Sequence, residues 1–262
     1  MQLSNRLTTV AQFVTKGNRV ADIGCDHAHT SIYLVENEIA VSSIAMDINK
    51  GPLERAKENI WHYQYEDKIT TRLSDGAKEL KVGEVDTLLI SGMGGLLMKK
   101  ILSDSIEVVK EAKELILQPQ SEIALVRKYI YELGFFIEKE AMLIEDEKYY
   151  TVIKAVRADI LDGEIEITKE EPITKLPNCI ENLQKNISKK PYEREIFYRY
   201  GKILLEEKNP VLKQFLDYGK QSYENILETI SEQLSEKTQL RCKELKEELK
   251  YIGEALEYYG VK

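Results

Sequence analysis

The chain has 262 residues, of which 43% are hydrophobic and 31% are charged, and its formal net charge is −8. This length suits one large domain or two smaller ones with a well-buried core, and the composition excludes a disordered chain. The acidic balance gives no support to nucleic-acid binding, although a local basic patch can coexist with it, and no apolar run reaches the roughly 18 residues of a membrane span.

Strand and helix patterns alternate along the first half of the chain. Short β-rich runs lie at 19–23, 42–47, 69–73, 85–90 and 115–117, and helical stretches lie between them at 30–36, 52–66, 94–104 and 121–133. Two late strands, 136–142 and 149–156, are expected as an antiparallel addition at one edge. Together these elements predict an α/β fold with a Rossmann-like, doubly wound, mostly parallel sheet of seven strands.

The second half of the chain has a different composition. Residues 161–177 are polar and without periodicity, which is typical of a linker or an irregular cap. Apolar side chains then recur at three- and four-residue spacing over 212–234 and 245–256, which predicts a C-terminal α-helical coiled coil or helical hairpin. We therefore expect one domain at 1–160 and a linker plus helical domain at 161–262. A structural bundle and a substrate-binding unit are equally good interpretations of the latter.

The cysteines and the N-terminus indicate where the protein resides. The 3 cysteines are odd in number and far apart, so neither a disulfide framework nor a zinc site is expected. No basic segment followed by a continuous apolar stretch opens the chain, so we expect no secretory signal. The sequence predicts a cytoplasmic protein with free thiols, no metal and no membrane contact.

The loop after the first predicted strand contains the first candidate site residues. In an open parallel sheet, ligands bind beyond the carboxyl ends of the strands. Gly24 permits a tight turn and a close ligand approach between Asp22 and Asp26. This loop has one glycine where the dinucleotide-binding fingerprint needs three, and Asp26 would repel a pyrophosphate. The loop therefore favours a ligand that lacks phosphate and has some positive charge.

The next three loops extend this pattern. Asp47 ends the second strand, where an acid can accept hydrogen bonds from both ribose hydroxyls. Asp75 and Gly76 follow the third strand, where a carboxylate could receive the amine of an adenine. The glycine-rich residues 91–95 leave room for a reacting group, and 118–120 are expected to face them. Together these features predict S-adenosylmethionine as the ligand.

Each of these residues also has an ordinary structural explanation. Asp22 and Asp26 could cap a helix, and His27 could be a structural hydrogen-bonding residue. Asp75 could belong to a simple turn, and the glycines of 91–95 could serve close packing. Independent causes of this kind would not place four signals after four successive strands, so a ligand site is the favoured interpretation.

Five stretches carry a resemblance to a known family. They are LSNRLTTVAQFV from Leu3, ADIGCDHAHTSIYL from Ala21, GPLERAKENI from Gly51, ISGMGGLLMKKIL from Ile90 and LILQPQSEIALVR from Leu115. In these stretches the chain resembles the bacterial tRNA (adenine-22-N1)-methyltransferases. The resemblance spans roughly residues 1–157, and the helical remainder fits that family's C-terminal coiled-coil domain. Cys25 stands where the family commonly has Ser, and Gln120 where it commonly has Asn.

The resemblance implies that S-adenosylmethionine supplies a methyl group to N1 of adenine 22 in tRNA. We expect the cofactor to be bound by Asp22, Gly24, Asp26, Asp47, Ile48, Asp75, Gly76, Gly92 and Met93. The substrate is expected at Arg6, Gly94, Gly95, Pro119 and Gln120.

Three residues are candidates for a catalytic role: Asp26, His27 and Gln118. Asp26 is preferred over His27 for stabilising charge or relaying a proton, because a carboxylate suits a cationic product, and Gln118 could accept a hydrogen bond from the adenine N6 amine. Phosphate contacts, or merely a solvated face, would come from Arg6, Lys99, Lys100, Arg127 and Lys128. We expect a monomer.

Two other functions remain open from the sequence. One is an S-adenosylmethionine-dependent methyltransferase acting on another RNA, a protein or a small molecule, and the acidic net charge favours the protein or the small molecule. The other is a binding module with a vestigial sheet domain. The presence of Asp26, Asp47 and Asp75 argues against this second function, because a vestigial site would not need these acids.

Overall fold

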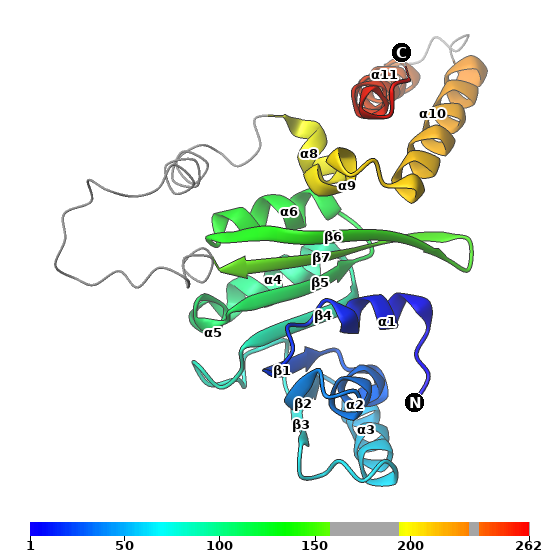
Figure 1. Cartoon of the computed structure of the whole chain (residues 1–262). Helices are drawn as coiled ribbons and strands as arrows, with labels where there is room; N and C mark the ends of the chain where they lie inside the picture. The colour runs from blue at the N-terminus through cyan, green and yellow to red at the C-terminus, as the bar shows by residue number, and fades with distance from the viewer. Residues whose placement is uncertain (158–193, 231–235, 262) are drawn as a thin grey trace, which may run out of the picture. The chain divides into compact units, whose positions relative to one another are not determined.

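The computed structural model describes residues 1–157, 194–230 and 236–261 (Figure 1). These residues belong to two compact units, one within Met1–Glu170 and the other within Glu171–Lys262. The predicted linker at 161–177 and the domain boundary after residue 160 lie outside the described residues, so that boundary stays a prediction.

The first unit contains the predicted seven-stranded sheet. Its strands are β1 (Asn18–Ile23), β2 (Ala40–Asp47), β3 (Ile69–Leu73), β4 (Thr87–Met93), β5 (Glu114–Pro119), β6 (Phe135–Glu145) and β7 (Lys148–Arg157). Their order is β3-β2-β1-β4-β5-β7-β6. The first five pair in parallel, whereas β7 is antiparallel to both β5 and β6. The Rossmann-like fold and its antiparallel edge are thereby confirmed.

Two groups of helices accompany the sheet. One comprises α1 (Asn5–Gln12), the 3₁₀ turn η1 (Asp26–Ala28), α2 (His29–Glu36) and α3 (Lys50–His62), and the other α4 (Gly95–Asp104), α5 (Ile106–Glu111) and α6 (Ile123–Glu132). Helix α1 contacts α2 and α2 contacts α3, while α4 contacts both α5 and α6. Figure 1 shows α1 in front of the sheet and α4 behind it, as a doubly wound fold requires.

The structure corrects several predicted boundaries. Strand β4 continues past Ile90, because Ser91 still pairs with Gln118 of β5 before the register shifts at Met93. The helix expected over 52–66 ends at His62, since Gln64 adopts a positive φ of 60°. Helices α1 and α5 are additions that the alternating pattern does not predict.

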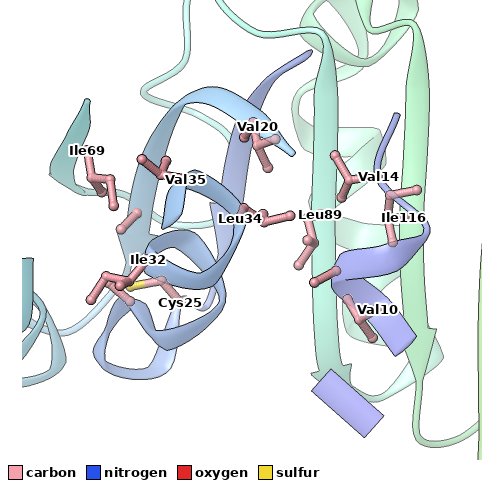
Figure 2. Packing of buried hydrophobic residues seen from close by; sticks show 14 of the residues in the cluster. Val10, Val14, Val20, Cys25, Ile32, Leu34, Val35, Ile69, Leu89 and Ile116 are labelled. Carbon is pink, nitrogen blue, oxygen red and sulfur yellow. The ribbon is translucent and has the colours of Figure 1, made fainter. Parts of the chain in front are cut away.

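One face of the sheet and the helices above it share a hydrophobic core. Val10 of α1, Ile32 of α2 and Leu89 of β4 are fully buried in this cluster. Figure 2 shows Val10 and Val14 beside Leu89 and Ile116, and the sulfur of Cys25 close to Ile32. Burial of the α1 side chains fixes this helix against β4 and β5, near the ends of the strands where a site is expected.

The second unit is helical, as predicted. It contains α8 (Glu195–Tyr200), α9 (Lys202–Glu206), α10 (Pro210–Ile230), α11 (Glu236–Leu256) and the 3₁₀ turn η3 (Glu257–Tyr259). Asn209 caps α10, because its Oδ1 accepts from the backbone N–H groups of Val211 and Leu212 at 3.0 Å. Helices α10 and α11 contact each other, and Leu212 and Leu245 are buried. A coiled coil over their full length stays a prediction, and Leu234 lies outside the described residues.

Candidate functional site

A cavity of about 390 Å³ lies at the carboxyl ends of β1, β2, β4 and β5. Its volume falls within the range of ligand pockets, about 300–1,000 Å³. It is lined by Arg6, Leu7, Asp22, Gly24, Cys25, Asp26, His29, Thr30, Asp47, Ser91, Gly92, Met93 and Gln120. The loops expected to meet at this edge of the sheet therefore do meet, with the exception of the loop after β3. No cluster of three or more potential metal ligands occurs among the residues that the structure describes.

Gly24 brings bare backbone to the cavity. Its φ of +76° favours glycine, and a Cβ at this position would collide with the side chain of Met93. The backbone N–H groups of Gly24 and Cys25 both donate to the carbonyl of Met46, at 2.8 and 3.0 Å. The loop after β1 is thereby tied to β2, and its backbone stays close to the cavity.

The three residues that follow Cys25 have an unusual backbone conformation. Asp26, His27 and Ala28 have φ values of 33°, 68° and 61°. Left-handed conformations cost a non-glycine residue roughly 1–2 kcal/mol each, and such strain clusters at functional sites. This turn leads directly into α2 and sets the directions of the side chains on either side of it.

Asp26 and His27 lie beside each other, with His27 Nε2 3.6 Å from Asp26 Oδ1, but only one of them lines the cavity. The Asp26 side chain is 92% exposed and lines the cavity. His27 does not line the cavity: its Nε2 lies 3.2 Å from Nη1 of Arg55, and its carbonyl accepts from Asn59 of α3 at 3.0 Å. Of the two candidates for a catalytic role, the structure therefore brings only Asp26 to the cavity.

His29 is a lining residue that the sequence analysis missed. Its Nδ1 is buried and has no hydrogen-bond partner in the part of the chain that the structure describes. Burial lowers the pKa of His29 below its ordinary value. Leu7, Thr30, Cys25 and Ser91 were also missed as lining residues, although all four lie inside the stretches that carry the family resemblance.

Asp22 is buried beneath the cavity at the end of β1. Its Oδ2 accepts from the Ser31 hydroxyl at 2.8 Å, and the Ser43 hydroxyl lies 3.0 Å from that of Ser31. Burial raises the pKa of Asp22 to about 6, more than the hydrogen bond from Ser31 lowers it. A cationic ligand group would therefore meet a carboxylate that forms no ion pair with any of the residues that the structure describes.

The predicted ribose- and adenine-binding residues are placed differently. Asp47 lines the cavity, and its Oδ1 accepts from the backbone N–H of Asn49 at 2.8 Å. Ile48 is 61% exposed beside it and does not line the cavity. Asp75 and Gly76 also lie outside the cavity lining. Asp75 pairs with Lys78 at 2.5 Å, and this hydrogen bond lowers its pKa.

Gln118 requires a correction. Its side chain is fully buried, and its Oε1 accepts from Arg6 Nη1 at 2.8 Å, from the Gly92 N–H at 3.1 Å and from Ser91 Oγ at 3.3 Å. A carboxamide oxygen has two lone pairs, so these three donors leave none for the N6 amine of a substrate adenine. Gln118 instead fixes the glycine-rich loop and Arg6 from below.

Arg6 reaches the cavity from α1, as expected of a substrate-binding candidate. Besides Gln118, its Nη1 donates to Ser91 Oγ at 3.3 Å. Its backbone N–H donates to Glu145 at 3.0 Å, and its guanidinium lies 5.3 Å from the ring centre of Tyr150. The β6–β7 pair thus holds α1 in place through both the backbone and the side chain of Arg6.

The other predicted substrate-binding residues separate into two groups. Gln120 lines the cavity, next to Gly92. Gly94 and Gly95 do not, and they are packing glycines: a Cβ on Gly95 would lie 2.6 Å from the Ser121 carbonyl, to which the Gly95 N–H donates at 3.1 Å. Pro119 is buried at the end of β5.

The basic residues offered as phosphate contacts also differ from one another. Arg127 is buried and donates to the buried Glu140 at 2.7 Å, so it is not available to a phosphate. Lys100 pairs with Asp104 at 2.7 Å, and Lys99 lies 5.0 Å from the ring centre of Tyr129 on the surface of the α4–α6 pair. None of the helices that the structure describes has the length and apolarity to cross a bilayer.

Comparisons with known proteins identify the family of the chain. Residues 3–153 match the family model of a methyltransferase domain. The tRNA (adenine(22)-N(1))-methyltransferase of Bacillus subtilis (strain 168) is 36% identical over 159 residues, which cover 61% of this chain and 67% of that protein.

Two solved structures extend the similarity to nearly the whole chain. The B. subtilis m1A22 tRNA methyltransferase TrmK has 29% identity and a TM-score of 0.77, with 97% of this chain and 99% of that chain covered. Streptococcus pneumoniae Sp1610 in complex with S-adenosyl-L-methionine has 26% identity and a TM-score of 0.75, with 97% and 100% covered. The chain therefore belongs to the methyltransferase-domain family and, within it, to the tRNA (adenine(22)-N(1))-methyltransferases.

Proposed function

We propose that this chain transfers the methyl group of S-adenosylmethionine to N1 of adenine 22 in tRNA. The observation that carries the proposal is the carboxylate-lined cavity at the carboxyl ends of the central strands, in a chain of this family. The free thiols of Cys25 and Cys242 suit an enzyme of the reducing cytoplasm.

The residues around the cavity fit this cofactor, which combines adenosine without phosphate, an amino-acid tail and a positively charged sulfur. Asp22, Asp26 and Asp47 supply three carboxylates. Gly24 brings the backbone itself to the cavity, because it has no Cβ, and a Cβ added there would collide with the Met93 side chain. The charge of the donor set favours a cationic nucleoside over a nucleotide.

Each carboxylate has a proposed task. Asp47 holds the ribose hydroxyls, because the Asn49 N–H orients its carboxylate through Oδ1. Asp22 and Asp26 bind the amino-acid tail, and the exposed Ile48 packs beside the adenosine. When bound, S-adenosylmethionine supplies an electrophilic methyl group on its sulfonium.

Adenine N1 carries an in-plane lone pair and needs no deprotonation before it attacks. Positioning the base in line with the methyl group therefore supplies much of the rate. N1 lies on the Watson–Crick edge, so the base must be unpaired or turned out of its helix. Positive charge develops on the adenine, and the Asp26 carboxylate at the cavity stabilises it.

The helical unit is proposed to position the tRNA, which is much larger than the cavity. Helices α10 and α11 supply a long surface with many charged side chains. A chain truncated after residue 160 should bind S-adenosylmethionine normally, but it should bind and methylate tRNA more weakly than the full chain does. Equal methylation rates would assign the helices a purely structural role.

One incubation tests the substrate class. Purified protein and methyl-labelled S-adenosylmethionine are mixed separately with bulk unmodified tRNA, with a protein extract and with a metabolite extract. Label should enter the tRNA alone. Label that enters the protein or metabolite fraction instead would contradict the proposal.

A further inference from the structure

Two hydrogen-bonding side chains border a stretch of the cavity that has no side chain of its own. Gly92 has a φ of +79°, and the position of a Cβ on it would lie 3.8 Å from Gln120 Nε2 and 3.9 Å from Arg6 Nη1. All three residues line the cavity. The space above Gly92 is therefore bordered by a carboxamide and a guanidinium, both of which can bind the edge of a nucleobase.

Arg6 and Gln120 differ in how many of their hydrogen-bonding groups are already used within the protein. Arg6 Nη1 already donates to Gln118 and to Ser91, at 2.8 and 3.3 Å. Gln120 is exposed, and within the described residues its carboxamide makes no hydrogen bond, while its backbone N–H donates to the Met93 carbonyl at 2.9 Å. Its backbone is thus fixed beside the glycine-rich loop, and both its amide donor and its carbonyl acceptor remain available.

We propose that the Gln120 carboxamide recognises the target adenine through its N6 and N7 atoms. This inference rests on the proposed function. The carbonyl oxygen would accept from the N6 amine and the amide nitrogen would donate to N7, the pairing by which glutamine binds adenine in nucleic acids. Contact at N6 and N7 leaves N1, which must attack the methyl group, free of hydrogen bonds.

This pairing also discriminates between purines. Guanine presents an oxygen at position 6, so the glutamine oxygen would face a second acceptor instead of an amine. Gln120 would therefore select adenine at the reacting position, whereas Gln118, with its oxygen already filled, would act only by holding Gly92 and Arg6 in place.

An atomic substitution in the substrate tests the inference. Three full-length proteins are compared: wild type, Gln120→Ala, and Gln12→Ala as a control for an exposed glutamine outside the cavity. Each receives a tRNA transcript with adenine at position 22 and a ligated transcript with 7-deazaadenine there. The latter base keeps N1 and N6 but has C–H in place of N7. The measured quantity is kcat/KM for methylation at saturating S-adenosylmethionine.

We expect 7-deazaadenine to lower kcat/KM of the wild type and of Gln12→Ala by about 5- to 100-fold, the discrimination of a good base contact. In Gln120→Ala the unmodified substrate should already be slower by a similar factor, and 7-deazaadenine should add less than about twofold. Unchanged calorimetric affinity for S-adenosylmethionine would show that the variant is folded.

Two results would overturn the inference. One is a wild type that methylates both transcripts equally well, and the other is a Gln120→Ala variant that keeps the full sensitivity to 7-deazaadenine. A wild type that does not methylate the unmodified transcript at position 22 would overturn the proposed function as well, so the two failures are distinguishable.

Discussion

Arg6 Nη1 donates to Gln118 Oε1 over 2.8 Å, although 112 residues separate the two along the chain. The same oxygen accepts from the Gly92 N–H at 3.1 Å. The bonds join α1, the end of β4 and the end of β5 at a single buried carboxamide. A helix that precedes the alternating strand–helix pattern therefore forms part of the cavity wall.

This arrangement predicts that Gln118 stabilises the folded protein and does not contact the substrate. Gln118→Leu removes the shared acceptor and leaves buried donors unsatisfied, so it should lower the free energy of unfolding by about 1–3 kcal/mol. Urea denaturation measures this effect. Gln120→Leu, two residues further on but exposed, should change stability by less than about 0.5 kcal/mol. Equal stability of Gln118→Leu and the wild type would refute the structural role.

Asp47 and Asp75 give a matched pair for cofactor binding. Asp47→Ala should weaken S-adenosylmethionine binding by roughly 1.5–3 kcal/mol, the range for hydrogen bonds to a charged group. Asp75→Ala should weaken it less, since Asp75 lies outside the cavity lining and pairs with Lys78. Calorimetric titration of both variants is the measurement. A larger loss for Asp75→Ala would mean that the loop after β3 closes on the cofactor.

Asp26 is the residue expected to affect the chemical step. Asp26→Asn keeps the size and tolerates the positive φ of 33°, but it removes the charge, so turnover should fall by about 10²-fold or more. His27→Asn should cost less, because His27 contacts Arg55 and does not line the cavity. Single-turnover rates at saturating cofactor decide, and near-normal turnover of Asp26→Asn would leave catalysis to positioning alone.

Burial of Asp22 predicts a pH-dependent stability. Its pKa lies near 6 in the folded chain, above the ordinary 3.8. Well below pH 3.8 the carboxyl is neutral in both states. As the pH rises from about 4 to 6, the carboxyl ionises in the unfolded chain before it ionises in the folded chain. The free energy of unfolding therefore falls by up to about 3 kcal/mol and stays at the lower value above pH 6.

The variant Asp22→Asn removes this titration. Relative to the wild type without cofactor, its free energy of unfolding should therefore rise by up to about 3 kcal/mol between pH 4 and pH 7. Urea denaturation across this range is the measurement. A difference between the two proteins that does not vary with pH would contradict the raised pKa.

The sequence predicts the sheet well because its signals are local. The central strand at 85–90 ends in the apolar run 88–90, and Asp22, Gly24 and Asp47 lie at strand ends where topology alone brings them together. What it does not predict depends on side-chain direction. Gln118 and Gln120 are two residues apart, yet one is buried and the other exposed, and no pattern in the sequence says which of them meets the cavity.

The loop after β1 shows the same limit. The sequence analysis selects His27, and not His29, as a candidate site residue. In the structure, residues 26–28 have positive φ values, His27 contacts Arg55, and His29 lines the cavity. Arg127 looks like a surface cation in the sequence, and its burial against Glu140 depends on how α6 packs against β6. These side-chain positions depend on tertiary contacts between elements that are distant in the sequence, and local sequence patterns do not specify such contacts.

The most direct test of the account is to locate the methyl group. An unmodified tRNA transcript is incubated with the full-length protein and S-adenosylmethionine, digested with a ribonuclease and analysed by mass spectrometry, beside a transcript with guanine at position 22. The account predicts 1-methyladenosine at position 22 of the first transcript and no methylation of the second. A methyl group at any other nucleotide, or on both transcripts, would contradict it.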